Sequence, residues 1–422
     1  MTSALDFMLA ARRSEMQGLQ ALSLTCALVV QVSRLVHALQ RERGYSNFCL
    51  GGQAASHAQM LDALSQQAQE QERVVRTALG EMDLERGSSA DKAQLYTRIA
   101  YALHVLDGLP ALRQRVREAS VSAAEATRHF SRLVAALLAV VFEAADTAVD
   151  PRVTRALVAL FNFMQGKELA GPERATGVAG FMAGYFDAAL QDRLRFLQDG
   201  QQRCFESFIE AADDASRADW DQLCTAELVE QIERLRQMAM RTTSDQRVQG
   251  ELGDVWFDLT SARMDTMKQI EDQLADSLQQ LCAQQTRKAK ADLDNQRRLL
   301  RQLDQLDRDA GQGAPRLYNV QATDLQALPG EAPGGQVNRS LLDALHEQTQ
   351  RLQQLQDELE QARETLNERK LVERAKGLLM SQHDLNEEQA YRTLQNAAME
   401  RGQRLADVAR TLLNHSDQRK PL

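Results

Sequence analysis

The sequence predicts an all-α protein, and three features of its composition support that prediction. Alanine, leucine, glutamine, arginine and glutamate are abundant among the 422 residues, and these residue types lose little freedom on entering a helix. Aromatic residues make up only 5% of the chain, whereas strands favour aromatic and β-branched types. Only seven prolines occur over the whole length. Because 422 residues exceed one ordinary domain, we expect two or three helical folding units.

Residues 1–307 consist of long amphipathic segments joined by short breaks. The breaks fall near residues 51–52, 85–89, 108–110, 150–151 and 242–250. Short connections of this kind join antiparallel neighbours in helical bundles. We therefore predict an N-terminal domain, 1–307, built as two helical bundles. Its long last helix, predicted at residues 259–306, would tie the bundles together.

A change of composition follows this region. Between residues 311 and 335 the chain holds five glycines and three of its seven prolines, without a sustained apolar period. Such composition is typical of a flexible linker. We place the linker at residues 308–338 and expect the parts on either side to move relative to each other.

The remaining residues, 339–422, begin with a coiled-coil-like helix. Its seam steps by alternating fours and threes over nearly four heptads, with one polar interruption, through Leu341, Leu345, Gln348, Leu352, Leu355, Leu359, Ala362 and Leu366. Either the 341–366 seam pairs with a second copy in a homodimer, or it packs on another helix of its own chain. The helix continues through residues 371–380, and two short helices follow, divided by the glycine stop at Gly402.

Charge, cysteines and hydropathy exclude several classes of protein. The net charge of -9 argues against a globally basic nucleic-acid coat, although residues 369–422 carry ten Lys and Arg against seven Asp and Glu. The five cysteines are scattered without metal-ligand spacing, as free thiols of a reducing compartment would be. The longest apolar run, 133–142, is about half of a membrane helix, and no signal-peptide pattern opens the chain. We therefore expect a cytoplasmic protein without a membrane partner.

Enzymatic signals are weak. The sequence shows no glycine-rich phosphate loop, no metal-ligand spacing among its seven histidines, and no Ser-His-Asp or Cys-His pattern on plausible turns. Its many acidic residues on helices are typical of solvated faces. We predict that the protein is not an enzyme and holds no cofactor.

An arginine falls within the apolar stripe of the first long helix. The stripe that includes Val36 and Leu39 reaches Arg43 at its next step, whereas Arg41 should face water. A buried unpaired cation costs several kcal/mol, so Arg43 needs an anion. That anion is either a glutamate on a facing helix or a bound ligand.

A second arginine enters an apolar stripe farther along. Stepping by threes and fours from Met164 leads to Arg174, although Pro172 can break or kink the helix and shift this register. Two such arginines between helices would form a small cationic pocket. Their planar, forked donors suit a small planar oxyanion.

The residues around both arginines resemble a known sensor family. The similarity spans residues 20–300 and rests on the run Gln-Arg-Glu-Arg-Gly-Tyr-Ser at 40–46 and, downstream, on Glu168, Gly171, Glu173 and Arg174. These motifs are similar to those of the NIT domain, the all-helical nitrate- and nitrite-sensing module. The resemblance implies that Arg43 and Arg174 bind nitrate or nitrite as a regulatory ligand, with Ser46 as a candidate helper.

The C-terminal helices resemble a second family. The pattern runs in order through residues 375–380, 388–390, 397–398 and 405–409, and it is similar to that of ANTAR domains, which are small RNA-binding antiterminator modules. Basic residues can contact RNA phosphates, and small residues beside them let RNA approach a helix closely. On charge alone a solvated face explains these residues equally well. With the resemblance, the candidate RNA-binding residues are Arg374, Ala375, Lys376, Gly377, Arg401 and Arg404.

Together the two resemblances match nitrate-responsive antitermination regulators. We therefore predict a signal-transduction protein in which nitrate or nitrite controls binding of the C-terminal module to a stem-loop in leader mRNA. Binding would prevent termination and so act indirectly on the transcription elongation complex, in operons of nitrate assimilation. The alternative is an anion-sensing scaffold whose C-terminal helices bind a protein partner. A DNA-binding factor would need a recognition helix, and residues 403–413 barely qualify.

Overall fold

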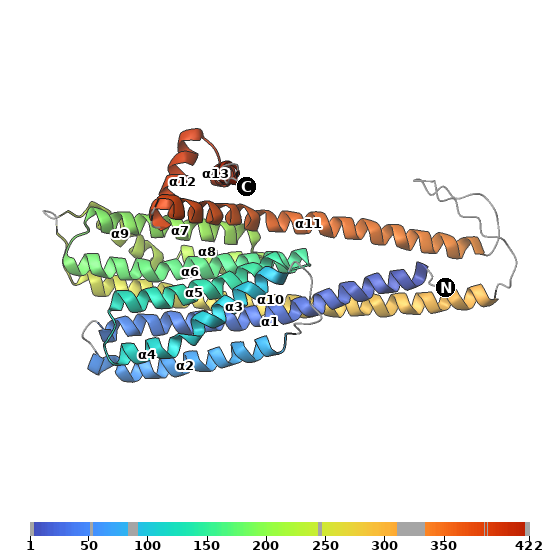
Figure 1. Ribbon diagram of the computed structural model, residues 1–422, viewed down its shortest axis with the longest axis horizontal. Helices are drawn as coiled ribbons and strands as arrows, with labels where there is room; N and C mark the ends of the chain where they lie inside the picture. Colours follow the sequence, from blue (N-terminus) through green and yellow to red (C-terminus); the bar gives the residue numbers. More distant parts are fainter. Residues whose placement is uncertain are drawn as a thin grey trace.

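The part of the chain that the structure describes is helical and contains no strand, as the composition predicts. The structure is a computed structural model that describes residues 4–50, 54–82, 92–243, 247–309, 334–383, 385 and 387–417. Most of its helices lie along one long axis, and the last two helices stand off to one side (Figure 1).

The N-terminal half of the sensor is one helical bundle. Its elements are α1 (Ala4–Phe48), α2 (Ala54–Gly80), α3 (Ala93–Asp107), α4 (Leu109–Arg117) and α5 (Ala123–Asp146). The long α1 lies between α2 and α5, and α3 packs on α5. The break at Gly108 is confirmed, while the turn between α4 and α5 was not predicted.

A second bundle follows and shares α1 with the first. It consists of α6 (Pro151–Ala183), α7 (Ala188–Ala211), α8 (Asp214–Cys224), α9 (Glu227–Arg241) and α10 (Leu252–Asp309). Helix α6 packs on α7 and α10, and α10 also packs along α1. The predicted last helix, 259–306, is therefore confirmed as a tie between the bundles, and it begins seven residues earlier than expected.

Helix α6 carries the second candidate arginine and is fixed at both ends by its sequence. The carboxylate of Asp150 accepts hydrogen bonds from the N–H groups of Arg152 and Val153, and Pro151 occupies the first turn. Gly184 ends the helix in the left-handed conformation, with φ of 80°. Pro172 lies inside this continuous helix and does not break it, so the predicted register through Arg174 is kept.

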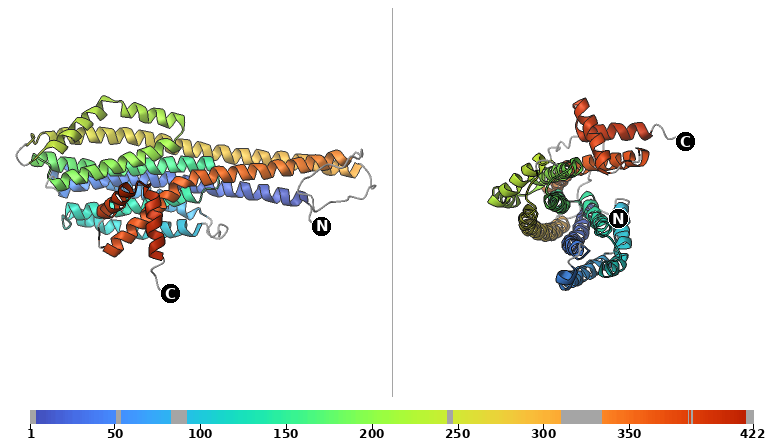
Figure 2. Two further views of the ribbon diagram at one scale, coloured as in Figure 1. Left: turned by 90° about the horizontal axis from the view of Figure 1, so that it is seen from above. Right: turned by 90° about the vertical axis from the view of Figure 1, so that its left-hand side faces the viewer.

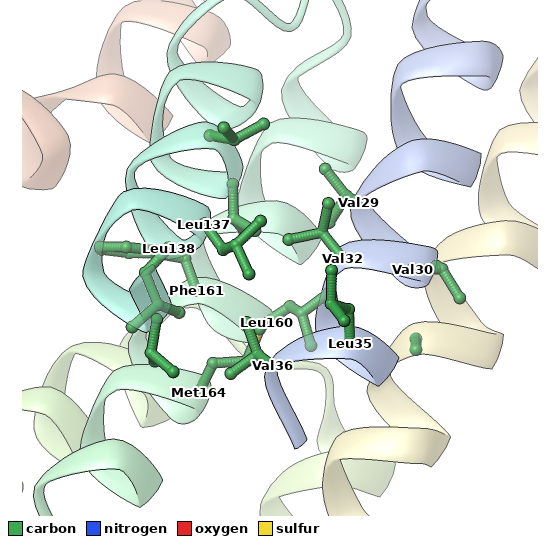
Figure 3. Close-up of a cluster of buried hydrophobic side chains, with 14 of the residues drawn as sticks. Val29, Val30, Val32, Leu35, Val36, Leu137, Leu138, Leu160, Phe161 and Met164 are labelled. Atoms are coloured by element: carbon green, nitrogen blue, oxygen red, sulfur yellow. The ribbon is translucent and has the colours of Figure 1, made fainter. Parts of the chain in front are cut away.

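The apolar core joins α1, α5 and α6. Figure 3 shows Val32 and Val36 of α1 facing Leu137 of α5 and Leu160 of α6, and these side chains are almost fully buried. Burial of such residues contributes roughly 1.5–3 kcal/mol for each side chain. This core therefore holds α1 and α6 side by side directly next to the two candidate arginines.

One helix of the described residues is long and apolar enough to cross a membrane, on length and composition alone. It covers residues 9–47 of α1, and 67% of its most apolar stretch is buried inside the protein. Burial of this kind is also typical of the central helix of a bundle, and α1 occupies that place.

The C-terminal unit begins with α11 (Gly334–His383) and ends with α12 (Glu387–Arg401) and α13 (Leu405–Asp417). Figures 1 and 2 show α11 lying along one side of the sensor, with its first half beside the projecting ends of α1 and α10. Arg351 of α11 joins these three helices, because it lies 3.2 Å from Glu15 and 3.5 Å from Asp292.

The predicted seam of α11 packs on its own chain where its side chains are described. Leu366 is almost fully buried in the sensor core, Leu355 and Leu359 are half-buried, and Leu352 is 50% exposed. The second of the two arrangements that the sequence allows therefore holds for the C-terminal part of the seam. The side chains of 334–348, and residues 310–333 of the predicted linker, lie outside the described residues.

Candidate anion site and RNA-facing module

Arg43 lies in the buried stripe of α1, as its spacing predicts, and Arg41 beside it is exposed. The Arg43 guanidinium donates two hydrogen bonds to the carboxylate of Glu168 on α6, from Nη1 to Oε1 at 2.5 Å and from Nη2 to Oε2 at 3.1 Å. Nη1 also donates to Ser131 at 2.8 Å. The anion that partners Arg43 in this structure is thus a glutamate on a facing helix.

Arg174, on the same helix as Glu168, has a different environment. It is half-buried, its Nη1 donates to Ser261 at 2.9 Å, and its guanidinium carbon lies 5.0 Å from the Phe257 ring centre. Among the described residues, no carboxylate lies within ion-pair distance of it. Burial lowers the pKa of Arg174 below its usual value, and the positive charge of Arg43 lowers it further.

Glycines let the two arginines approach the neighbouring helices. A Cβ atom at Gly171 of α6 would lie 2.9 Å from Nη2 of Arg43, and one at Gly44 of α1 would lie 3.5 Å from Nη2 of Arg174. Each guanidinium therefore lies against the backbone of the opposite helix. Arg43 is paired with Glu168, whereas Arg174 has no carboxylate within ion-pair distance among the described residues, so the cluster lacks a close counter-charge that a monovalent anion can supply.

Ser46 does not join this cluster. Its hydroxyl donates to the carbonyl oxygen of Glu42 at 2.8 Å, and it lines a cavity of about 10 Å³ beside Arg113. A cavity of that size holds no more than about one water molecule. The structure thus brings Arg43 and Arg174 together and places the third predicted residue on another face of α1.

Two further arginines, Arg236 and Arg263, surround one buried glutamate and were not predicted from the sequence. Glu173, fully buried on α6, accepts two hydrogen bonds from Arg236 at 2.7 and 2.9 Å, and Arg263 lies 3.8 Å away. Burial and the charge of Arg236 lower the pKa of Arg263 to about 10. The signal for Arg263 is the one that identified Arg43, because it stands in an apolar stripe of α10 four residues before Met267.

A buried lysine lies one residue before Glu168. Lys167 forms an ion pair with Glu271 of α10, and Glu271 also accepts hydrogen bonds from Ser33 at 2.7 Å and from Lys268 at 3.1 Å. Burial opposes ionisation of Glu271, but the charges of the two lysines outweigh it and lower its pKa to about 2. This cluster fixes α6 to α10 and α1 near the candidate site.

The C-terminal unit has its own small core, formed by the end of α11 with α12 and α13. Among the predicted RNA-binding residues, Arg374, Gly377, Arg401 and Arg404 are exposed. Lys376 is nearly buried and donates to Glu373 at 2.9 Å. The six residues therefore do not form one continuous exposed set.

Ala375 is the clearest exception. It is fully buried in the core of the unit, together with Leu379, Ala390 and Ala409. Its side chain is therefore not accessible in this arrangement, where it serves close packing of α11 against the two short helices.

Comparison with known proteins gives both halves of the chain a family. Residues 34–279 match a family model described as "Nitrate and nitrite sensing" (NIT), and residues 360–413 match the ANTAR domain. A nitrate regulatory protein of Klebsiella oxytoca is 35% identical over 414 residues, covering 97% of this chain and 94% of its own length. The chain belongs to the NIT–ANTAR family of nitrate regulatory proteins. The NIT match includes Arg43 and Arg174, and the ANTAR match includes all six candidate RNA-binding residues.

A solved structure supports the same assignment. The structure of the NasR transcription antiterminator is 33% identical to this NIT–ANTAR chain, covers 98% of it and 99% of its own length, and superposes with a TM-score of 0.58. Sensor and RNA-binding families of this kind are regulatory, so the prediction that the chain is not an enzyme is confirmed.

The ANTAR unit is docked on the NIT domain. Tyr391 of α12 lies against α7, where its ring centre is 6.1 Å from that of Phe196 and 4.4 Å from the guanidinium carbon of Arg203. Arg392 lies 3.2 Å from Asp192 on the same helix. This contact joins a helix of the RNA-binding family directly to the sensor.

The final part of α11 is also attached to the NIT domain. Arg369 stacks 4.7 Å from the Phe161 ring centre and donates to Asn162 at 2.9 Å, while Lys370 lies 2.6 Å from Asp146. Phe161 and Asn162 belong to α6, the helix that carries Arg174. The helix that holds the candidate anion site is therefore in direct contact with the helix that begins the ANTAR unit.

A large cleft lies away from the two arginines. Its volume is about 1000 Å³, and it runs between α11 and the ends of α6, α7 and α10. Its lining includes Arg152 and Arg155, but also Glu210, Asp213 and Glu364. The mixed charge gives no preference for an anion, so the buried arginine cluster remains the better candidate site.

Proposed function

We propose that this chain is a cytoplasmic, nitrate-responsive transcription antiterminator. Nitrate or nitrite binds as the regulatory ligand between α1 and α6, through the guanidiniums of Arg43 and Arg174. The observation that carries this proposal is the excess positive charge of that cluster, where Arg174 lies beside Arg43 without a carboxylate of its own. Each guanidinium can offer two parallel hydrogen bonds to a planar oxyanion.

We propose three parts for the chain, and the family matches at 34–279 and 360–413 support the first and the last of them. Residues 1–307 form the sensor, 308–338 the linker, and 339–422 the RNA-binding unit. In the unit, the exposed residues Arg374, Gly377, Arg401 and Arg404 contact the RNA, with phosphate contacts supplied by the arginines. The 341–366 seam supplies the surface for a homodimer, and the 50% exposure of Leu352 supports this proposal.

Ligand binding controls the contact between the two parts. Anion binding draws α1 and α6 together, and because α11 packs on α6 through Arg369, this movement weakens the docking of the ANTAR unit. A released unit binds a stem-loop in leader mRNA and prevents termination, which acts indirectly on the elongation complex at nitrate-assimilation operons. Nitrate shifts this balance only by its differential affinity for the two arrangements.

Calorimetric titration of nitrate into the full chain tests the site. Arg43→Ala and Arg174→Ala should each weaken binding by about 100-fold, because hydrogen bonds to charged groups contribute ~1.5–3 kcal/mol each. Arg41→Ala is the matched control, since this arginine is exposed and two residues from Arg43. Unchanged affinity in both site variants would exclude the site.

Fluorescence anisotropy with a labelled stem-loop RNA tests the output. The full chain should bind the RNA more tightly with nitrate present, and Arg374→Ala and Arg401→Ala should reduce that affinity. If the chain shows no preference for the stem-loop over random RNA at moderate salt, the C-terminal helices are a protein-binding scaffold and not an antiterminator.

A further inference from the structure

The carboxylate of Glu168 occupies the position that a planar oxyanion would take on Arg43. We infer that Glu168 is an internal competitor of nitrate: it holds the forked face of Arg43 in the free protein, and nitrate binds by displacing it. This inference rests on the proposed function, since it concerns the regulation of the same site. It assigns to Glu168 the role of setting the nitrate concentration at which the protein responds.

The hydrogen-bond donors around Glu168 are arranged as a planar oxyanion requires. Its two carboxylate oxygens accept hydrogen bonds from Nη1 and Nη2 of Arg43, and Oε2 also accepts one from Nε2 of Gln40 at 2.8 Å. Three N–H donors thus converge on a planar group with one negative charge and two coplanar oxygens. Nitrate has the same shape, the same charge and the same acceptors at this edge.

The two Nη donors of Arg43 that hold Glu168 are enclosed by other groups. Nη1 is shared between Glu168 and Ser131, and Nη2 lies against the backbone at Gly171, where even a Cβ atom would be 2.9 Å away. A bidentate anion can therefore take this pair of donors only when Glu168 leaves them. Ligand and carboxylate exclude each other at the same donors.

The Glu168 side chain is closer to solvent than the Arg43 side chain is. The Glu168 side chain is 14% exposed, twice the 7% of Arg43, so a displaced carboxylate can turn toward water. The adjacent Lys167 is paired with Glu271 of α10 and so does not compete for the displaced carboxylate. The carboxylate then recovers the hydration that compensates for the lost ion pair.

The exchange changes how α1 is attached to α6. Before it, Arg43 is anchored at Glu168; after it, the anion joins Arg43 to Arg174, six residues farther along α6. At about 1.5 Å per residue this moves the anchor point by about 9 Å along the helix. Competition with Glu168 thus links the occupancy of the site to the relative position of the two helices that carry it.

The test is a nitrate titration of four full-length proteins: wild type, Glu168→Gln, Glu168→Asp and the control Glu42→Gln. Glu168→Gln removes the competing charge and should tighten nitrate binding by about ten-fold, a gain that corresponds to ~1.4 kcal/mol. Glu168→Asp keeps the charge but is too short to hold both donors of Arg43, so it should also bind nitrate more tightly than wild type. Glu42→Gln removes a buried carboxylate next to Arg43 that pairs with Arg113 instead, and should leave affinity unchanged.

The outcomes separate this inference from the proposed function. If Arg43→Ala abolishes binding but Glu168→Gln binds nitrate no more tightly than wild type, the competitor role is wrong and the site stands. If neither variant changes the affinity, the site itself is wrong. A gain in Glu168→Gln that Glu168→Asp lacks would show that the charge acts at a distance, which contradicts displacement.

Melting temperatures with and without nitrate check that the variants fold. Nitrate should raise the melting temperature of Glu168→Gln most, because Arg43 lacks an anion in that variant.

Discussion

Glu42 and Arg43 are neighbours on α1, yet they belong to buried clusters of opposite kinds. Glu42 accepts two hydrogen bonds from Arg113 at 2.7 and 2.8 Å and one from Ser65 at 2.7 Å, so one carboxylate meets one guanidinium. Arg43 has a similar forked pair with Glu168, but Arg174 adds a second guanidinium without a second carboxylate.

The difference shows how to separate a structural ion pair from a ligand site. Both clusters bury charged groups, and both satisfy most of their hydrogen bonds. Only the cluster of Arg43 keeps an unbalanced charge, and an unbalanced buried charge favours an incoming counter-ion. Burial of an arginine alone therefore does not identify a binding site. A buried arginine that lacks a nearby carboxylate is the better indicator.

The largest effect is expected when the balanced cluster is broken. Arg113→Ala leaves the carboxylate of Glu42 buried without its partner, which should lower the free energy of unfolding by about 3–5 kcal/mol. Urea denaturation measures this loss. Arg117→Ala, one turn along on the surface and paired with Asp62, is the matched control and should change stability by less than ~1 kcal/mol. A small loss for Arg113→Ala would mean that the Glu42 cluster is not the structural one.

The cluster of Lys167, Lys268 and Glu271 is a second structural cluster, and its contribution to stability depends on pH. The folded pKa of Glu271, about 2, is depressed from 4.5, so its stabilising contribution is complete above pH 4.5 and is lost as pH falls to about 2. This contribution is on the order of 3 kcal/mol. Acid unfolding should therefore be less steep between pH 4.5 and 2 in Glu271→Gln than in wild type, and that variant should be less stable at pH 7. Identical acid profiles would contradict the depressed pKa.

The smallest effect on stability is expected at the proposed ligand site. Arg174→Ala removes a cation that burial and Arg43 both disfavour, so the unfolding free energy without nitrate should change by no more than about 1 kcal/mol despite the lost Ser261 hydrogen bond. The same urea experiment measures it. A loss as large as that of Arg113→Ala would make Arg174 a structural residue and remove the distinction between the two clusters.

The sequence predicted the fold and the first arginine because both follow from local periodicity. Helix-forming composition fixed the class, and the apolar stripe of α1 located Arg43 without knowledge of its partner. Arg174 was predicted from a stripe that runs past Pro172, a residue able to shift the register, and the helix continues through it. Arg263 obeys the same stripe rule on α10 and lies inside the helix predicted at 259–306, yet it was not singled out because no family motif marks it.

Partners across the fold could not be predicted in the same way. The choice of Glu168 for Arg43, and the contact of Tyr391 with Phe196, depend on which helices become neighbours after packing. Ala375 shows the limit most clearly, because a small residue in a basic helix suits close packing as well as RNA contact. Ser46 lies one turn beyond Arg43, but its hydroxyl bonds to the helix itself.

A structure of the full chain with nitrate bound tests the central claim most directly. The account predicts a planar anion within about 3 Å of guanidinium nitrogens of both Arg43 and Arg174, since that is the normal hydrogen-bond distance. Glu168 should have left Arg43 in that structure. An anion bound elsewhere, with Arg174 still lacking an anionic partner, would contradict the account.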